Sequence, residues 1–171
     1  MTVGIIGATG YVGAELLRLL LRHPNAEKIV LSSVTFHGQN MEDVYPNFRG
    51  LLAPKCDGVL LSADEVLNES QIIFTALPHG IAESYAVFAE RNGKKLIDLS
   101  ADFRFDDDEK TFVQWYKKNW EHPEIHKKSV YGLPEMNRDL IKNACIVGNP
   151  GCYVTAITLA LLPALKNQII L

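Results

Sequence analysis

Three glycines at regular spacing, Gly7, Gly10 and Gly13, separate an apolar run from an amphipathic run at the start of the chain. Residues 2–6 (Thr-Val-Gly-Ile-Ile) are typical of a buried parallel strand, and residues 14–22 are typical of a helix. A strand, a glycine-rich turn and a helix in direct succession form the start of a dinucleotide-binding unit. This succession therefore predicts an α/β domain.

Each glycine has its own role in such a turn. Gly7 allows the tight turn, Gly10 lets the backbone approach a pyrophosphate, and Gly13 lets the helix pack close to the strand. The phosphates would lie at the helix N-terminus. The spacing is G-x-x-G-x-x-G rather than the commoner G-x-G-x-x-G, so a purely structural turn is the alternative. The predicted cofactor-binding residues of this turn are Gly7, Ala8, Thr9, Gly10, Tyr11, Val12 and Gly13.

Strand-like and helix-like runs alternate along the rest of the chain. Further strands are predicted at residues 27–33, 71–76, 95–99 and 144–147, and further helices at residues 81–91 and 156–162. This alternation predicts an α/β fold: a Rossmann-like, doubly wound, mostly parallel sheet with helices on both faces. Without a repeat or a linker-like stretch, residues 1–171 are expected to form one domain.

Shorter features complete this outline. Ser62 and Glu65 have the spacing of a capping box, and the acidic cluster at residues 106–109 is placed to start a helix. Asn137 is expected to cap a short helix that runs to Lys142. The remaining expectations are a loop-rich excursion at 36–57 with an incidental Cys56, a turn-rich segment at 130–135 and a new strand at 167–171.

The end of the second strand bears on the choice of cofactor. Rossmann domains that prefer NAD usually carry an acidic residue there, for the ribose 2′-hydroxyl. Here Ser32 and Ser33 are followed by Val34 and Thr35, with no carboxylate. Hydroxyl groups can hydrogen-bond a 2′-phosphate, so Ser32 and Ser33 favour NADP, although ordinary polar loop residues are the alternative.

Two further segments follow strands and are expected to line the same crevice, because ligands of open α/β sheets bind beyond the carboxyl ends of strands. Leu77, Pro78, His79 and Gly80 are predicted to face the cofactor, and His79 is more typical of a polar loop residue than of a general base. In the segment 100–104, Arg104 is a candidate anion clamp because its planar fork suits phosphate or carboxylate. The alternative is a surface pair between Asp102 and Arg104.

Cys152 lies where a predicted strand becomes a predicted helix. A helix N-terminus stabilises an anion, and this position favours a nucleophilic thiolate. Together with a nicotinamide cofactor, such a thiolate suggests attack on an activated acyl carbon, a thioester and hydride transfer. Asn149 and the backbone N–H of Cys152 are the predicted oxyanion donors. The alternative is a small buried cysteine at a tight Pro-Gly turn.

Composition excludes several classes of protein. The net charge of −3 gives no general attraction to nucleic acid or anionic membranes. No apolar run approaches the ~18–20 residues that span a bilayer, and no signal peptide precedes the first strand. Three cysteines without framework spacing favour a reducing compartment, so a cytoplasmic protein is expected. No cluster has zinc-site spacing, so no metal is expected.

The stretch around Cys152, residues 147–163, resembles the active-site signature of the N-acetyl-gamma-glutamyl-phosphate reductases, arginine-pathway relatives of aspartate-semialdehyde dehydrogenase. Segments 7–13, 77–80, 100–104 and 130–135 also resemble that family, at matching places in the chain order. The resemblance covers nearly the whole chain. Val154 stands where many relatives have proline, a change that removes no catalytic group.

The resemblance implies NADPH-dependent reduction of N-acetyl-L-glutamyl 5-phosphate to N-acetyl-L-glutamate 5-semialdehyde, with release of phosphate. Cys152 would form the thioester, and Arg104 with Ser100 would contact the substrate phosphate. The full-length enzyme is expected to be a homo-oligomer that acts on a small molecule.

One departure concerns length, because members of this family are about twice as long and carry a second α+β domain. That domain is expected to supply the catalytic histidine, much of the substrate pocket and most of the subunit interface. We therefore expect residues 1–171 to be the cofactor-binding half, which alone binds NADP weakly and turns over poorly or not at all. The histidines that do not match the family's base are His23, His37, His79, His122 and His126.

Three alternatives stay open on the sequence. A sister enzyme could act on aspartyl phosphate or on a carrier-bound aminoadipyl or glutamyl phosphate, although residues 130–135 favour the acetylglutamyl branch. A non-catalytic NADP-binding or regulatory module is a second alternative. A dehydrogenase of free aldehydes that uses NAD is less favoured, since no acidic residue follows the second strand.

Overall fold

The computed structural model describes residues 1–105 and 108–170, which form an α/β domain around one parallel sheet. Within these residues the sheet has seven strands in the order β3-β2-β1-β4-β5-β7-β6, and every pairing is parallel. The predicted fold class is confirmed, and the sheet is parallel throughout rather than mostly parallel. The strands are β1 (Thr2–Ile6), β2 (Lys28–Ser32), β3 (Leu60–Leu61), β4 (Ile72–Thr75), β5 (Lys95–Asp98), β6 (Ser129–Tyr131) and β7 (Ile146–Gly148).

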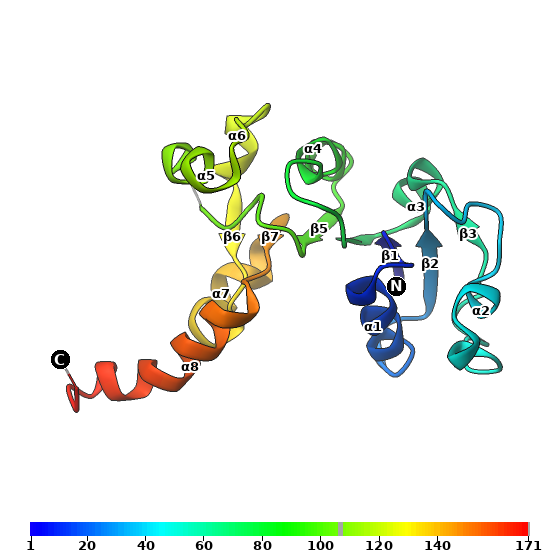
Figure 1. Cartoon of the computed structure of the whole chain (residues 1–171), viewed down its shortest axis with the longest axis horizontal. Coiled ribbons are helices and arrows are strands. Elements are labelled where there is room, and N and C mark those ends of the chain that lie inside the picture. The colour runs from blue at the N-terminus through cyan, green and yellow to red at the C-terminus, as the bar shows by residue number, and fades with distance from the viewer. Residues whose placement is uncertain (106–107, 171) are drawn as a thin grey trace.

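Helices cover both faces of this sheet (Figure 1). Helices α1 and α2 lie on one side, whereas α3 and α4 lie on the other. The last helix, α8, runs away from the sheet toward the C-terminus. The helices are α1 (Tyr11–Leu20), α2 (Met41–Val44), α3 (Ala63–Glu69), α4 (Ala82–Arg91), α5 (Glu109–Tyr116), α6 (Pro123–His126), α7 (Pro134–Asn143) and α8 (Cys152–Lys166), with a 3-10 turn η1 (Pro46–Phe48).

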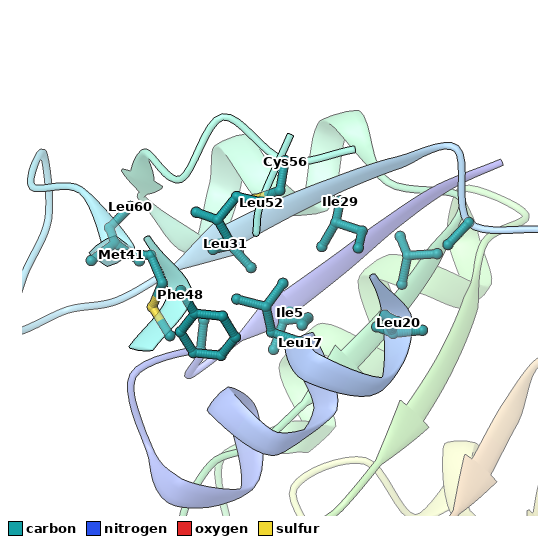
Figure 2. Close-up of a cluster of buried hydrophobic side chains, with 13 residues drawn as sticks. Ile5, Leu17, Leu20, Ile29, Leu31, Met41, Phe48, Leu52, Cys56 and Leu60 are labelled. Carbon is teal, nitrogen blue, oxygen red and sulfur yellow. The ribbon is translucent and has the colours of Figure 1, made fainter. Parts of the chain in front are cut away.

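Two apolar clusters, one on each face, form the core. Figure 2 shows the first, in which Leu17 and Leu20 of α1 pack against Ile5 of β1 and Ile29 and Leu31 of β2. The second cluster joins β-strand residues of the opposite face to α3 and α4. Successive strand residues point to opposite faces, and a parallel sheet buries both, which explains the near-continuous apolar runs in the sequence.

Local predictions had mixed outcomes. The capping box is confirmed, because the Ser62 hydroxyl accepts from Glu65 N at 3.3 Å and the Glu65 carboxylate accepts from Ser62 N at 2.9 Å. Asp108 caps α5 by accepting from Thr111 N at 3.0 Å. Residues 106 and 107 of the predicted acidic cluster lie outside the described residues.

Other local predictions were wrong. Asn137 does not begin a helix, because α7 starts at Pro134 and Asn137 lies at a kink, where its side chain donates to Tyr131 O at 3.0 Å. Residues 130–135 contain most of strand β6, which is too short to show an alternating pattern. Residues 167–170 follow α8 as a turn rather than a strand, whereas the loop-rich excursion at 36–57 is confirmed, with the short α2 and η1 inside it.

Candidate functional site

The order of the strands brings four predicted site segments to one edge of the sheet. The chain runs outward from β1 to β3 and then returns to β4, on the other side of β1, so a topological switch point lies between β1 and β4. Backbone hydrogen bonds link the first residues beyond neighbouring strands: Ala76 N to Ile6 O at 2.8 Å, Leu99 N to Thr75 O at 2.9 Å, and Asn149 N to Asp98 O at 2.8 Å. The segments 7–13, 77–80, 99–104 and 148–152 therefore follow neighbouring strands at this edge.

The three glycines of the first turn differ in what surrounds them. Gly7 has φ +86°, and a Cβ there would collide with Ala76 O across the switch point. A Cβ at Gly13 would lie 2.7 Å from the Cα of Ala8. Gly10 is exposed, and a Cβ there would meet only Gly7 O at 3.6 Å. The protein's own packing thus explains Gly7 and Gly13, whereas open space at Gly10 fits the approach of a ligand.

The N-terminus of α1 is suited to an anion. Its first helical hydrogen bond runs from Ala14 N to Gly10 O at 2.9 Å, so the N–H groups of residues 11–13 have no acceptor within the helix. The first turn carries neither an acidic residue nor a side-chain cap. Because the positive end of the helix dipole is not neutralised there, the turn fits the pyrophosphate of a dinucleotide.

Ser32 and Ser33 are buried and fix the glycine turn to β2. Ser32 O accepts from Gly7 N and Ala8 N at 3.2 and 2.9 Å. The hydroxyls of Thr9 and Ser33 lie 2.8 Å apart, and the Ser33 hydroxyl also accepts from Phe36 N at 3.3 Å. In a further contact, which no sequence pattern indicates, the Tyr45 hydroxyl donates to Thr9 O at 2.9 Å.

The loop after β4 faces the glycine turn and is anchored through His79. Leu77 lies beside Gly7, and Pro78, His79 and Gly80 are exposed. His79 Nδ1 accepts from Ala101 N at 3.1 Å, which places the proton of the neutral ring on Nε2. Tyr116 packs edge-on against this ring at 4.8 Å between centroids. These contacts agree with a loop histidine and tie the loop after β4 to the loop after β5.

Asp102 does not pair with Arg104, so that alternative is wrong. The Asp102 carboxylate is buried and accepts from the N–H groups of Gly80, Ile81 and Ala82 at 2.6, 3.0 and 3.0 Å. Helix α4 has no side-chain cap from its own N-cap residue, Ile81. Asp102 therefore caps α4 from a distant part of the chain, a role that local sequence spacing does not reveal.

Arg104 is half-buried, and within residues 1–105 and 108–170 its side chain is bound through two neutral carbonyl groups. Its Nε donates to Asn149 O at 2.8 Å, and its Nη2 donates to Leu99 O at 3.0 Å. Among the ion pairs of the described residues, none involves Arg104. Since Nη1 lies 3.3 Å from the position of a Cβ on Gly151, the guanidinium borders the cysteine turn.

Ser100 and Asp98 lie beneath Arg104. The Ser100 hydroxyl donates to the Asp98 carboxyl at 2.6 Å and accepts from Asp102 N at 3.1 Å. Burial raises the pKa of Asp98, and the nearby Asp102 charge adds to this, against hydrogen bonds from Ser100 and Thr75. Because Ser100 is buried and its proton points to Asp98, the geometry favours a supporting role over the predicted contact with phosphate.

Cys152 is exposed at the first position of α8, so the prediction of a strand–helix junction is confirmed and the buried alternative is wrong. Its helix has Gly151 as N-cap, with neither a side-chain cap nor an acidic residue in the first turn. The positive end of the dipole therefore faces a thiolate at Cys152. By contrast, burial raises the pKa of Cys56 to about 11 and also raises that of Cys145.

The cysteine turn packs tightly on the loop that carries Arg104. A Cβ at Gly148 would lie 2.5 Å from the carbonyl carbon of Phe103, so only glycine fits there. The Asn149 side chain donates to Pro150 O at 3.1 Å, and its second N–H stays a predicted oxyanion donor. Among the described residues no histidine hydrogen-bonds to Cys152, and His126 is fully buried against Glu83 at 2.9 Å.

Residues 1–105 and 108–170 contain no group of three or more His, Cys, Asp or Glu side chains that could hold a metal ion. None of their helices combines the length and apolar character that a membrane crossing requires.

Known proteins resemble this chain in sequence and in fold. N-acetyl-gamma-glutamyl-phosphate reductase of Clostridium beijerinckii is 53% identical over 98% of this chain and 47% of its own length. The corresponding protein of Pelotomaculum thermopropionicum is 48% identical over 98% of this chain and 48% of its own length. The chain thus spans about half the length of the curated relatives it matches.

Among solved structures, aspartate semialdehyde dehydrogenase II of Vibrio cholerae matches 96% of this chain and 46% of its own, with a TM-score of 0.67 and 21% identity. The enzyme of Candida albicans with NADP matches with a TM-score of 0.61 and 15% identity. These structures show that the fold is shared. Residues 2–144 match the family described as "Semialdehyde dehydrogenase, NAD binding domain". The chain therefore belongs to the family of semialdehyde dehydrogenase NAD-binding domains.

Proposed function

We propose that the protein that carries this chain is an NADPH-dependent acyl-phosphate reductase of arginine biosynthesis. It reduces N-acetyl-L-glutamyl 5-phosphate to N-acetyl-L-glutamate 5-semialdehyde and releases phosphate. The substrate class is supported by relatives about 50% identical that carry the name N-acetyl-gamma-glutamyl-phosphate reductase. The likeness to aspartate semialdehyde dehydrogenases, at 15–21% identity, supports the fold alone.

Arg104 carries the chemical side of this proposal. Within the described residues this half-buried guanidinium is bound by two carbonyls and by no carboxylate, and burial of a charge without a counter-charge is costly. An anionic ligand beside Cys152 would offset this cost. The remaining donors of the planar fork suit a phosphate group. A cation and a nucleophile in neighbouring loops match a substrate whose acyl carbon carries a phosphate.

The residues of this chain account for the first half of the reaction. The Cys152 thiolate attacks the acyl carbon, so a C–S bond forms, and the C–O bond to phosphate breaks with its electron pair leaving on phosphate. Arg104 stabilises that leaving group, while Cys152 N–H and the Asn149 side chain donate to the acyl oxygen. When bound, the nicotinamide cofactor supplies the hydride that reduces the thioester. The C–S bond then breaks, and the thiolate is restored.

NADP is the proposed cofactor, with its pyrophosphate at Gly10 and the N-terminus of α1. The preference for NADP over NAD is supported by the lack of a carboxylate at residues 32–36, after β2. Ser33 itself is buried and bonded to Thr9, so the exposed Thr35 is better placed for a 2′-phosphate than either serine.

We further propose that the second half of the longer protein completes the site and provides the general base. Helix α8 supports this view, because it has apolar residues all round and buries none of them, with Tyr153 81% and Ile157 59% exposed. A helix that is hydrophobic on all sides is normally enclosed by other elements. A second α+β domain would enclose it, and a homo-oligomer in the cytoplasm is the expected assembly. The base would lie beyond residue 171.

The test is a steady-state assay of the full-length protein, which follows NADPH oxidation with N-acetyl-L-glutamyl 5-phosphate. We expect turnover with NADPH, a much higher KM for NADH, and loss of turnover in the Cys152→Ala variant. Arg104→Ala is expected to raise the KM for the acyl phosphate. Aspartyl phosphate serves as the competing substrate, and preferential turnover of it would contradict the assigned substrate. Normal turnover by Cys152→Ala would contradict the mechanism.

A further inference from the structure

We propose that Asp98 is a positioning residue that orients Arg104 for the substrate phosphate through a single peptide group, the one that joins Leu99 to Ser100. Asp98 is the last residue of β5, is fully buried, and is not part of the chemistry proposed for Cys152. Its role rests on the proposed function, because Arg104 is the phosphate anchor there.

The contacts form a continuous chain from carboxyl to guanidinium. Asp98 Oδ1 accepts from Ser100 N at 3.2 Å, and Leu99 O accepts from Arg104 Nη2 at 3.0 Å. Ser100 N and Leu99 O belong to the same planar peptide group, which is therefore bonded at both ends. Hydrogen bonds in such a chain polarise one another, so the carboxyl strengthens the acceptor that orients Arg104.

Two further bonds hold the neighbouring parts of this loop, one to the Asp98 side chain and one to its main-chain carbonyl. Asp98 Oδ2 accepts from the Ser100 hydroxyl at 2.6 Å, and Asp98 O accepts from Asn149 N at 2.8 Å. Asn149 O is the second acceptor of Arg104, at 2.8 Å from Nε. Each carbonyl that binds the guanidinium is therefore linked to Asp98: Leu99 O through the N–H of Ser100 in the same peptide group, and Asn149 O through the N–H of Asn149. Asp98 is thus bonded to the loop after β5 through Ser100, to the loop after β7 through Asn149, and to β4 through Thr75.

The position of the carboxyl groups also keeps Arg104 available. Two acids precede Arg104, Asp98 at the end of β5 and Asp102 in the loop that follows, and either could neutralise Arg104 if it turned toward it. Asp102 is occupied by the N–H groups of residues 80–82, and Asp98 by Ser100 and Thr75. The network thus holds both of these acids away from the guanidinium, and no carboxylate of the described residues pairs with it.

Thr75 offers a matched control. Its hydroxyl donates to Asp98 Oδ1 at 2.8 Å, but it lies on β4 and has no bond to the peptide group that faces Arg104. Thr75→Val and Ser100→Ala each remove one hydroxyl that donates to Asp98. Only Ser100 lies in the loop that also carries Arg104, so only Ser100→Ala loosens that loop. Asp98→Asn retains one acceptor oxygen for Ser100 N, whereas Asp98→Ala retains none.

The experiment uses the full-length protein in the reverse direction, with N-acetyl-L-glutamate 5-semialdehyde, NADP and inorganic phosphate. It measures KM for phosphate and, separately, KM for NADP. Asp98→Ala is expected to raise KM for phosphate roughly ten- to a hundredfold, because an ångström-scale shift of a positioning group costs up to that factor. Ser100→Ala should raise it about tenfold at most, whereas Asp98→Asn and Thr75→Val should stay within about twofold. KM for NADP should stay within about twofold in all four.

A double-mutant cycle tests whether Asp98 acts through Arg104. In an Arg104→Ala background, Asp98→Ala should cause no further rise in KM for phosphate. Equal effects of Thr75→Val and Ser100→Ala, or a parallel rise in both KM values, would overturn the role of Asp98. If Asp98→Ala does not fold, the comparison of KM for phosphate between Ser100→Ala and Thr75→Val decides: a larger rise in Ser100→Ala supports the role of Asp98, and equal values overturn it. If the wild-type protein shows no phosphate-dependent reaction, the proposed function fails rather than the role of Asp98.

Discussion

Replacement of Asp102 should destabilise the domain far more than replacement of an ordinary helix cap. Asp102 is 1% exposed and accepts three backbone hydrogen bonds from the start of α4, 20 to 22 residues away in sequence. Asp108 makes the corresponding local contact for α5, with one bond to Thr111 N on an exposed surface. The two acids cap helices of similar length, so Asp108 is the natural reference.

The expected magnitudes follow from these contacts. A hydrogen bond to a charged group contributes about 1.5–3 kcal/mol, and bonds that share one carboxylate are not additive. Asp102→Ala also leaves the N–H of Ala82 buried without a partner. We therefore expect Asp102→Ala to cost about 3–5 kcal/mol and Asp102→Asn, which keeps one oxygen, about 2 kcal/mol. Asp108→Ala should cost about 1 kcal/mol.

The assay is urea unfolding followed by far-UV circular dichroism, with the free energy taken from the transition midpoint at constant slope. Hydrogen exchange at the amides of residues 80–86 gives a local readout, and protection there should fall in the Asp102 variants. A loss below about 1 kcal/mol for Asp102→Ala, equal to that for Asp108→Ala, would refute the long-range cap.

Three further predictions concern other parts of the domain. Gly10→Ala should fold like the wild type, since its Cβ meets open space, but should bind NADPH at least about tenfold more weakly because that space is where the pyrophosphate is proposed to lie. Gly13→Ala should instead lose about 2–3 kcal/mol of stability, because its Cβ would overpack against Ala8. Calorimetric titration with NADPH and thermal unfolding distinguish the two variants. Iodoacetamide near pH 8 should label Cys152 alone, because Cys56, with its pKa raised to about 11, and Cys145 react slowly; peptide mapping that found Cys56 labelled first would contradict the assigned exposure. Burial acts to raise the pKa of Glu83, but hydrogen bonds from His126 and from the N–H groups of residues 121 and 122 hold it below 4.5. The stability that a carboxyl with a lowered pKa contributes is present above pH 4.5 and is lost as pH falls through the folded-state pKa, so the cost of Glu83→Gln, measured by urea unfolding, should shrink between pH 6 and pH 3.

Features encoded by adjacent residues were predictable from the sequence. The strand–glycine–helix start, the capping box at Ser62 and the helix start at Cys152 each depend on residues a few positions apart. Their physical causes, burial on two faces and unpaired N–H groups at helix ends, act locally. For this reason the fold class and the position of Cys152 at the start of a helix could be predicted correctly.

Contacts between distant segments were not predictable in the same way. A pair between Asp102 and Arg104 was the alternative to an anion clamp at Arg104, yet the Asp102 acceptors are used by the start of α4. Ser100 was predicted to contact the substrate phosphate, and the sequence did not reveal that its hydroxyl bonds Asp98. A side chain's partner depends on which strands become neighbours, and the order β4-β5-β7 is not a local property of the sequence.

The central claim is that Cys152 forms a thioester with the acyl group while phosphate leaves beside Arg104. It is tested most directly by mass spectrometry of the full-length protein after brief mixing with N-acetyl-L-glutamyl 5-phosphate in the absence of NADPH. The predicted result is a single N-acetylglutamyl adduct on the peptide that contains Cys152, with release of an equal amount of phosphate and no adduct in Cys152→Ser. Reduction of the acyl phosphate by the Cys152→Ser protein at the wild-type rate, or an adduct on another residue, would contradict it.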